Sequence, residues 1–356
     1  MAHLFEPLRL RNLEFANRIA VSPMCQYSCN EGFANEWHLV HLGSRAVGRA
    51  GLVMAEATAV TSESRISPKD LGIWSDAHVE PLQRVFSFIA SHGSIPGIQL
   101  AHAGRKASTS EPWKGSHPVS PEQGGWTPIF APSAIAFNDG FQVPQALTVA
   151  QITAISQAFA RAAQRAEAAG AKVIEIHAAH GYLLHSFLSP LSNHRNDEYG
   201  GTFENRTRAL REVVASVRKV WPEQYPLFVR ISASDWAEGG WTLEDSVALA
   251  KILKSLEVDI VDCSSGGAVP HTKIPVGPGY QVPFAQRIRC EAGMPTGAVG
   301  MITDPAQADQ IIRTGQADIV FLARQMLREP YWPLHAARVL GQEIQWPSQY
   351  ERAKLK

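Results

Sequence analysis

Short apolar segments alternate with longer amphipathic segments along this chain of 356 residues, and eight such alternations predict a (β/α)8 barrel, an α/β TIM-barrel fold. Two observations favour the barrel over a doubly wound sheet. The chain contains neither G-x-G-x-x-G nor G-x-x-x-x-G-K-[ST], the phosphate-binding motifs of doubly wound proteins. It also exceeds the roughly 250 residues that a barrel needs, and the surplus falls in connections that follow predicted strands.

The predicted strands are short, apolar and rich in β-branched residues, as expected for a buried parallel sheet. The second strand reads GLVMAEATAV and the fourth reads VIEIH. The eight predicted strands cover residues 19–22, 51–60, 95–100, 173–177, 227–231, 258–263, 295–299 and 317–322.

The predicted helices show apolar residues at helical spacing, for example at positions 79, 82, 85, 86 and 89. Thr148 can cap one helix and Gly170 can end it. Asp304 before Pro305 marks another helix start. The predicted helices cover residues 35–47, 78–90, 148–169, 243–256, 282–292, 304–313 and 331–340.

Two long strand-to-helix connections, 101–147 and 180–207, follow the third and fourth predicted strands. Both should extend the loops on the C-terminal face of the barrel, where barrel enzymes keep their chemistry. We see no linker or low-complexity segment, so residues 1–356 are expected to form one domain.

Composition excludes several protein classes. The chain has 33 basic and 33 acidic residues, and this zero balance argues against a nucleic-acid binder. No apolar run approaches the roughly 18 residues of a membrane helix, and no signal peptide is visible. The four cysteines are too few for a disulfide scaffold, so we expect a cytoplasmic protein.

Polar side chains cluster just beyond several predicted strands. His177, His180 and Tyr182 in HAAHGY could converge on one ligand. Two histidines at this spacing could bind zinc, which would suit a metal-dependent barrel hydrolase. The neighbouring strand ends offer Gln99 and Arg230 where a metal site needs carboxylates, and Arg230 would repel a divalent cation. Recognition of an organic anion is therefore favoured, and we expect no metal.

Cys25 and Cys29 are spaced poorly for zinc and lack a second pair. Cys29 is expected to be inert. Cys25 stands at a strand end, where it could be a nucleophile or, more commonly for a free cysteine, a small buried hydrophobe.

Gly300 and Arg324 follow the seventh and eighth predicted strands, where barrels usually bind phosphate. A turn for Gly300 and a surface ion pair of Arg324 with Glu329 are the simpler alternatives. Gln99 and Arg230 could bind a polar heteroaromatic ring, and the histidines could bind a second ligand. Together with a phosphate site, this pattern suits a flavin mononucleotide (FMN) enzyme.

Five segments of the chain resemble the Old Yellow Enzyme family of FMN-dependent NADPH dehydrogenases and ene-reductases. Cys25 and the C-terminal QYER resemble the residues found in the thermophilic-like branch of this family. The chain is similar to the xenobiotic reductases. The resemblance covers essentially the whole chain. The segments are NRIAVSPMCQYS (17–28), EATAV (56–60), GIQLAHAGRKAS (97–108), EIHAAHGYLLHSFLSPLSNHRNDEYGGTFENRTR (175–208) and ITDPAQADQIIRTGQADIVFLARQMLREP (302–330).

The resemblance implies a non-covalent FMN site. Gln99 would bind the pyrimidine edge of the flavin, Arg230 would place positive charge near N1, and the Cys25 thiol would tune the potential. Many relatives have Gly-Arg where this chain has Ala323–Arg324. The residues implied in FMN binding are Ser22, Pro23, Met24, Cys25, Ala57, Gln99, Arg230, Gly300, Ala323 and Arg324.

The resemblance also implies two half-reactions. NADPH binds transiently and reduces FMN, and an α,β-unsaturated carbonyl or nitro compound then takes the hydride at Cβ. His177 and His180 would bind its oxygen, Tyr27 would contact it, and Tyr182 would protonate Cα. Arg352, in the segment 341–356, resembles an arginine that reaches a neighbouring subunit's site, which implies a homodimer or homotetramer.

Other flavin proteins stay as alternatives. Larger relatives, the dienoyl-CoA reductases and amine dehydrogenases, add an iron–sulfur cluster and a nucleotide-binding domain. Four scattered cysteines and an end at Lys356 argue against both additions. A flavin-binding protein without turnover is a further class.

Overall fold

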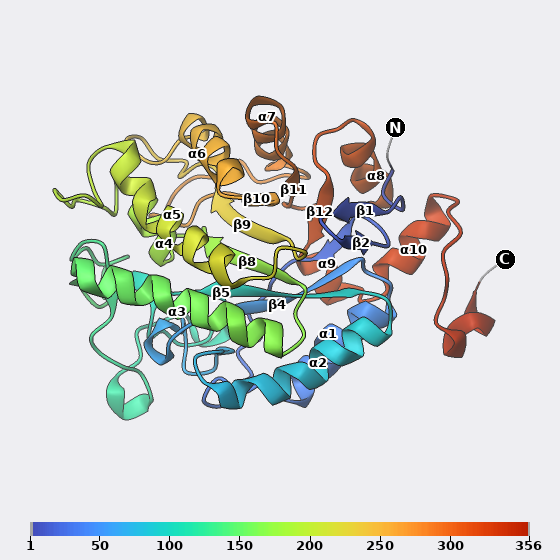
Figure 1. Ribbon diagram of the computed structural model, residues 1–356, viewed down its shortest axis with the longest axis horizontal. Helices are drawn as coiled ribbons and strands as arrows, with labels where there is room; N and C mark the ends of the chain where they lie inside the picture. Colours follow the sequence, from blue (N-terminus) through green and yellow to red (C-terminus); the bar gives the residue numbers. More distant parts are fainter. Residues whose placement is uncertain (1–2, 355–356) are drawn as a thin grey trace.

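A computed structural model describes residues 3–354 of the chain. Eight parallel strands close into a barrel and follow one another in chain order around it (Figure 1), which confirms the predicted (β/α)8 fold. The barrel strands are β3 (Ile19–Val21), β4 (Leu52–Ala59), β5 (Ile95–Ala101), β8 (Val173–Ala178), β9 (Leu227–Ser232), β10 (Ile260–Ser264), β11 (Thr296–Ala298) and β12 (Ile319–Leu322).

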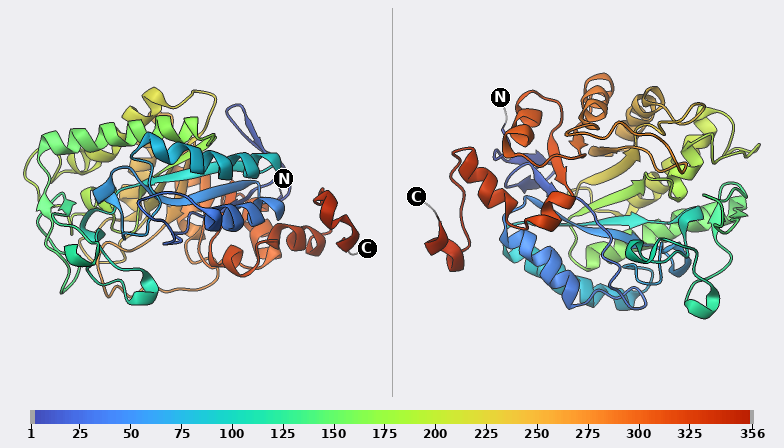
Figure 2. Two further views of the ribbon diagram at one scale, coloured as in Figure 1. Left: turned by 90° about the horizontal axis from the view of Figure 1, so that it is seen from below. Right: turned by 180° about the vertical axis from the view of Figure 1, so that it is seen from behind.

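Helices surround the barrel and bury one face each against it (Figure 2). Thr148 caps α3 by accepting a hydrogen bond from the Gln151 N–H, and Asp304 caps α8, as the sequence predicts. The helices are α1 (Glu36–Val47), α2 (Val79–Ser91), α3 (Val149–Ala168), α4 (Leu183–Leu188), α5 (Phe203–Val220), α6 (Leu243–Ser255), α7 (Val282–Ala292), α8 (Pro305–Arg313), α9 (Arg324–Arg328) and α10 (Trp332–Val339). None of the helices within residues 3–354 is long and apolar enough to span a membrane.

The connection 180–207 contains helix α4 and the first residues of α5. The predicted alternation requires a helix between the fourth and fifth strands, but no residue range was assigned to it from sequence, and α5 takes this place. Leu210, Val213, Val214 and Val217 of α5 are buried at helical spacing, and the helix packs against α3.

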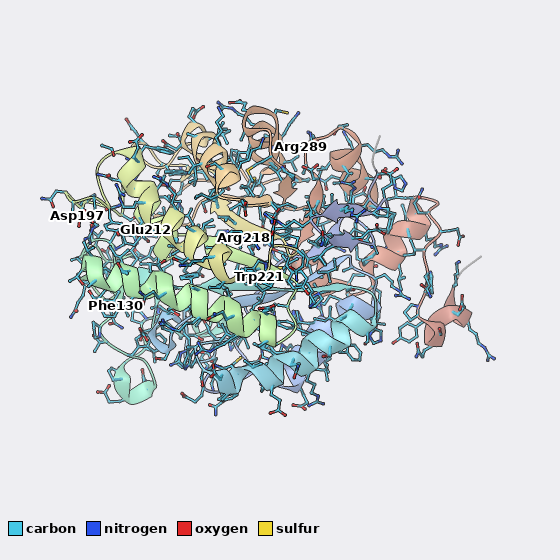
Figure 3. The ribbon with its side chains drawn as sticks, in the orientation of Figure 1. Phe130, Asp197, Glu212, Arg218, Trp221 and Arg289 are labelled. Atoms are coloured by element: carbon cyan, nitrogen blue, oxygen red, sulfur yellow. The ribbon has the colours of Figure 1, made fainter. Side chains whose placement is uncertain are left out.

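Side-chain hydrogen bonds hold both halves of α5, on which Figure 3 labels Glu212 and Arg218. The hydroxyl of Tyr199 donates to Glu212 at 3.0 Å. At the other end, Arg218 donates to the carbonyls of Trp221 and Pro222, just after the helix. These polar contacts supplement the packing of the helix against α3.

An antiparallel hairpin closes the N-terminal end of the barrel. It consists of β1 (Leu8–Leu10) and β2 (Leu13–Phe15). Leu8, Leu10 and Phe15 join a buried cluster with the residues that begin the barrel strands, including Val173 and Ile260. Within residues 3–354, the hairpin thus covers the N-terminal end of the barrel and leaves the C-terminal ends of the strands for ligands.

Small elements occupy the remaining connections. The connection 101–147 contains the strand pair β6 (Phe130–Ala131) and β7 (Gln145–Ala146). The C-terminal 3₁₀ helix η6 (Ser348–Ala353) stands away from the barrel (Figures 1 and 2).

Candidate functional site

The C-terminal ends of the strands bring together the side chains that the sequence places just beyond them. His177 lies opposite Arg230 in the β8–β9 register, and Gln99 lies beside Ala57 in the β4–β5 register. Arg230 donates a hydrogen bond to the Ser22 hydroxyl at 3.1 Å. Five strand ends thus share one polar surface inside the barrel mouth.

His177, His180 and Tyr182 form a compact aromatic group at this surface. The His177 ring centroid lies 5.2 Å from that of His180 and 5.0 Å from that of Tyr182. His180 Nε2 is hydrogen-bonded to the Ser264 hydroxyl at 2.7 Å, and His177 Nδ1 is buried without a partner among the described residues. The arrangement leaves His177 able to bind a ligand atom.

Burial decides the protonation of this group. Desolvation, followed by the charge of Arg230, lowers the pKa of both His177 and His180 far below the usual range. Desolvation also raises the pKa of Tyr182 above its usual value. At neutral pH the two imidazoles are therefore neutral, and the phenol keeps its proton.

A tight turn positions the group. His180 and Gly181 both have positive φ, 59° and 74°, and a Cβ on Gly181 would collide with the Gly267 carbonyl. The Gly181 N–H donates to Nδ1 of the buried His185 at 2.8 Å. Lys106 donates to the carbonyls of His180 and Gly267, both at 2.7 Å. The turn is thus held from three sides.

His185 and Asp235, which the sequence analysis did not single out, support this turn. His185 Nε2 lies 2.9 Å from Asp235 Oδ1, and neither side chain is exposed. Burial raises the pKa of Asp235, but His185 and hydrogen bonds from Ser189 and Trp241 outweigh it and lower the pKa. His185 could have been noticed in HAAHGYLLH, but its partner Asp235 lies fifty residues further along the chain.

Lys106 lies in the segment GIQLAHAGRKAS, and no role of its own was assigned to it from sequence. Burial first, and the charge of Arg105 second, lower its pKa to about 7. Its Nζ also lies 5.6 Å from the centre of the Tyr182 ring. Lys106 therefore combines backbone support of the turn with a cationic group beside the aromatic cluster.

The segment that follows β3 places Cys25 and Tyr27 beside this cluster. Burial raises the pKa of the Cys25 thiol well above its usual value, so the thiolate that a nucleophile requires is disfavoured. Tyr27 also has a raised pKa, caused first by burial and then by Cys25 and Tyr182. Both groups keep their protons at neutral pH.

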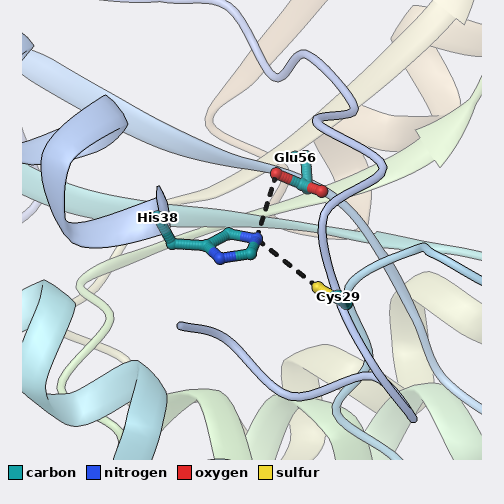
Figure 4. A group of neighbouring side chains, drawn as sticks. All are labelled: Cys29, His38 and Glu56. Carbon is teal, nitrogen blue, oxygen red and sulfur yellow. Dashed lines mark hydrogen bonds and ion pairs between the residues drawn. The ribbon is translucent and has the colours of Figure 1, made fainter. Parts of the chain in front are cut away.

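A buried cluster of Cys29, His38 and Glu56 lies behind that segment (Figure 4). His38 Nε2 is 3.5 Å from the Cys29 sulfur and 3.6 Å from Glu56 Oε2. His38 Nδ1 lies 3.1 Å from the Asn35 backbone nitrogen and 3.1 Å from Asn35 Oδ1. Glu56 Oε1 accepts from the Gln26 N–H. These contacts link the cluster to the segment bearing Cys25.

A separate cavity of about 270 Å³ opens beyond β11 and β12. It is lined by Gly300, Met301, Ala323 and Arg324, among others. Among residues 3–354, Arg324 makes no ion pair, and Glu329 pairs instead with His335. The simpler alternative of an Arg324–Glu329 surface pair is therefore wrong.

Gly300 has a backbone conformation that side chains rarely adopt, with φ of 125°. A Cβ there would lie 2.9 Å from Gln281 Nε2 and 3.1 Å from the Tyr280 ring. The Gly300 N–H donates to no other group of the described residues. Glycine thus keeps a backbone donor accessible at the cavity.

Arg352 does not join this site within its own chain. It lies exposed on η6, away from the barrel. The described structure brings together the other predicted site residues at the barrel mouth or along the adjoining cavity.

Comparison with known proteins identifies the family. The model of the NADH:flavin oxidoreductase / NADH oxidase family matches residues 3–343. The chain belongs to this family. It is 52% identical to the NADPH dehydrogenase of Geobacillus sp. (strain WCH70) and 48% identical to that of Bacillus subtilis (strain 168), with 98% of each chain covered.

Solved structures agree with this assignment. A morphinone reductase mutant in complex with tetrahydroNAD aligns with a TM-score of 0.78 and 27% identity, over 98% of this chain and 93% of that one. A 2-naphthoyl-CoA reductase complex aligns with a TM-score of 0.85 and 25% identity over 96% of this chain, which spans about half of that longer protein. The chain is an FMN-dependent oxidoreductase that takes electrons from NADPH.

The residues present suit FMN. The cavity beside β11 and β12 offers a cation, Arg324, and the accessible N–H of Gly300, which are donors that a phosphate group needs. The barrel mouth offers Gln99 and Arg230, which could meet the polar edge of a flavin ring. One end of the site thus provides phosphate donors and the other provides polar groups for a heteroaromatic ring.

Proposed function

We propose that this oxidoreductase reduces the activated C=C bond of α,β-unsaturated carbonyl and nitro compounds. The observation that carries the proposal is the group of two neutral histidines and a protonated tyrosine at the barrel mouth. FMN, when bound, accepts a hydride from NADPH and transfers it to the substrate. A metal-dependent hydrolase is not favoured, because the family is one of flavin enzymes.

The neutral imidazoles of His177 and His180 donate hydrogen bonds to the carbonyl or nitro oxygen. Negative charge develops on that oxygen as the alkene accepts hydride at Cβ, and oriented donors in a buried site stabilise it. His180 is already oriented by Ser264. Tyr27, across the pocket, contacts the substrate.

Tyr182 supplies the proton to Cα. Its raised pKa keeps the phenol protonated at rest, so the acid is available at every turnover. The turn at His180 and Gly181, braced by His185 and Lys106, sets the position of the hydroxyl.

The chain's other predicted residues hold the cofactor. Arg324 and the backbone at Gly300 and Ala323 bind the phosphate. Gln99 and Arg230 meet the pyrimidine edge, and the protonated thiol of Cys25 tunes the potential without covalent chemistry. The residues beside the ring are Ser22, Pro23, Met24, Cys25 and Ala57.

We also propose that the C-terminal segment 341–356 completes the site of a second copy in a homodimer or homotetramer. The exposed position of Arg352 on η6 supports this, because the side chain cannot reach the site of its own chain. A groove of about 730 Å³ between α10 and this segment, lined by Leu334, Ile344 and Trp346, offers apolar surface for such a contact.

The decisive experiment is anaerobic. NADPH should bleach the flavin absorbance, and cyclohexenone or a nitroalkene should restore it with formation of the saturated product. A phenol added to the oxidised protein should give a charge-transfer absorbance band with FMN when it binds in the substrate pocket. The double variant His177→Ala/His180→Ala should retain FMN but lose this band, whereas the control His194→Ala, at an exposed site, should keep it. Reoxidation by oxygen but by none of these compounds would contradict the proposal.

A further inference from the structure

Four polar side chains form one layer inside the barrel, immediately below His177. Gln99, Glu175, Arg230 and Asp262 come from the neighbouring strands β5, β8, β9 and β10. The register sets Gln99 opposite Glu175 and Arg230 opposite Asp262. All four are at most 6% exposed. We refer to them as the polar layer.

Three carboxylate oxygens of the polar layer lack a hydrogen-bond donor among the described residues. Gln99 Nε2 donates to Glu175 Oε1 at 2.7 Å. Glu175 Oε2 and both oxygens of Asp262 are buried, and no group of the described residues donates to them. Arg230 Nε lies 3.1 Å from Asp262 Oδ2 as an ion pair, but it is not aligned to donate. Burying unsatisfied carboxylate oxygens is costly, so a donor is required.

The missing donor can be a proton between the two carboxyl groups. Glu175 and Asp262 lie within hydrogen-bonding distance of each other. Two ionised carboxylates only accept hydrogen bonds, whereas a protonated one also donates. A single proton therefore satisfies both side chains.

We propose that Glu175 and Asp262 share one proton and thereby hold the polar layer at zero net charge, acting as positioning residues that set the reduction potential of the flavin. The link to the potential rests on the proposed placement of Gln99 and Arg230 at the pyrimidine edge. The shared proton itself rests only on the side chains of the barrel.

The charges of the layer are consistent with this arrangement. Burial raises the pKa of Glu175 to about 8, with Asp262 raising it and Arg230 and Gln99 lowering it. Burial also raises the pKa of Asp262, to about 6, against the opposing charge of Arg230. Glu175 therefore keeps its proton at pH 7, and the positive Arg230 is balanced by the negative Asp262.

The shared proton also orients Gln99. Because Glu175 directs its protonated oxygen toward Asp262, its other oxygen must accept from Gln99. The amide nitrogen of Gln99 is then committed to Glu175, and its carbonyl oxygen faces away from the layer. Gln99 thus presents an acceptor to the flavin edge, while Arg230 presents positive charge.

Substitutions in the layer should be strongly coupled. Glu175→Gln preserves the neutral charge and can donate to Asp262. Asp262→Asn removes the negative charge, but Glu175 then ionises beside Arg230 and restores the balance. The double variant leaves Arg230 uncompensated. The midpoint potential of its flavin should be more positive than the wild-type value. The shift should exceed the sum of the shifts that the two single variants show.

Infrared spectroscopy of the apoprotein tests the proton without flavin. Two buried carboxyl groups should contribute a protonated carbonyl band near pH 7, because burial raises the pKa of Glu175 to about 8 and that of Asp70 to about 7. In Asp70→Asn apoprotein, the remaining band should be present at pH 7, disappear as pH rises through about 8, and be absent when Glu175→Gln is added. The surface variant Glu244→Gln should leave the band unchanged. Absence of the band in Asp70→Asn apoprotein, or its persistence after Glu175→Gln is added, would overturn the proposal.

Stability gives a second readout. The native state holds the Glu175 proton up to pH of about 8, whereas the unfolded chain releases it near 4.5. Because the native state binds more protons between these values, its stability falls as pH rises through them. Glu175→Gln should remove this part of the decline.

The potentials separate the two parts of the argument. If the infrared band behaves as expected but the double variant keeps the wild-type potential, the link to the flavin is overturned, and the proposed placement of Arg230 fails with it. If the band and its pH dependence are absent, the shared proton is overturned whatever the flavin does.

Discussion

The two ends of the proposed flavin site are built differently. At the barrel mouth, the proposed chemistry uses the side chains of His177, His180 and Tyr182, and one turn of positive φ sets their position. At the phosphate end, Gly300 and Ala323 would contribute backbone N–H groups, and Arg324 would be the charged side chain. A backbone contribution tolerates substitution at Ala323, where φ is −98°, whereas Gly300, at φ of 125°, and the side chains depend on residue identity.

The largest expected effect is at the barrel mouth. Tyr182→Phe should slow reoxidation by cyclohexenone by about 10²–10⁴-fold, because it removes a positioned general acid. Reduction by NADPH needs no proton there and should be nearly unchanged. Stopped-flow measurement of both half-reactions tests this, with Tyr225→Phe, whose hydroxyl contacts Lys172, as the control. Equal slowing of both half-reactions would mean that Tyr182 only orders the pocket.

The turn should be the next most sensitive feature. Gly181→Ala should lower the free energy of unfolding by about 2–4 kcal/mol, since it combines positive φ with a collision against the Gly267 carbonyl. Gly140→Ala is a matched control, because Gly140 has a similar φ of 79° but no atom within 4 Å of a Cβ. Urea denaturation measures both variants. Equal losses would show that backbone strain alone decides the cost.

Removal of the cation at the phosphate end should have a smaller effect. Arg324→Ala should weaken FMN binding by about 10–150-fold, the loss expected for one charge-assisted hydrogen bond of about 1.5–3 kcal/mol. Fluorescence titration of apoprotein with FMN measures the dissociation constant. Arg313→Ala, which breaks a surface pair with Asp309, is the control. If the affinity for FMN is unchanged and the affinity for NADPH is weaker, Arg324 does not bind the FMN phosphate.

The smallest effect should come from Ala323→Gly. The backbone N–H survives this change, so affinity for FMN should stay within about threefold of the wild-type value. The same titration checks it. A larger change would show that the Ala323 methyl group, and not only the backbone, shapes the phosphate end.

The barrel could be predicted from sequence because its strands are buried on both faces and therefore read as apolar runs. The alternation also implies the helix α5, but its bounds were not assigned from sequence, although Leu210, Val213, Val214 and Val217 recur at helical spacing. The hairpin of β1 and β2 was also missed, since two three-residue strands carry too little pattern to identify.

The candidate site also contains residues that the sequence predicted and residues that it missed. His177, His180 and Tyr182 were found because they stand together in one motif just past a strand. The supporting pair of His185 and Asp235 was missed because the two residues lie fifty positions apart, one on α4 and the other just beyond β9. Arg230 and Asp262 likewise lie far apart in the chain and meet only through barrel register. The carboxylates of the polar layer lie within apolar strands, where sequence offers no sign of which polar groups face them.

The hairpin at the base of the barrel also constrains how the chain can fold during synthesis. The Leu4 N–H donates to Asp309, Arg11 donates to Asp259, and β3 pairs with β12 near residue 320. The hairpin segment is translated before these partners, so its apolar side chains stay exposed until the partners have been made. The base of the barrel therefore closes only after segments far along the chain have folded beside it.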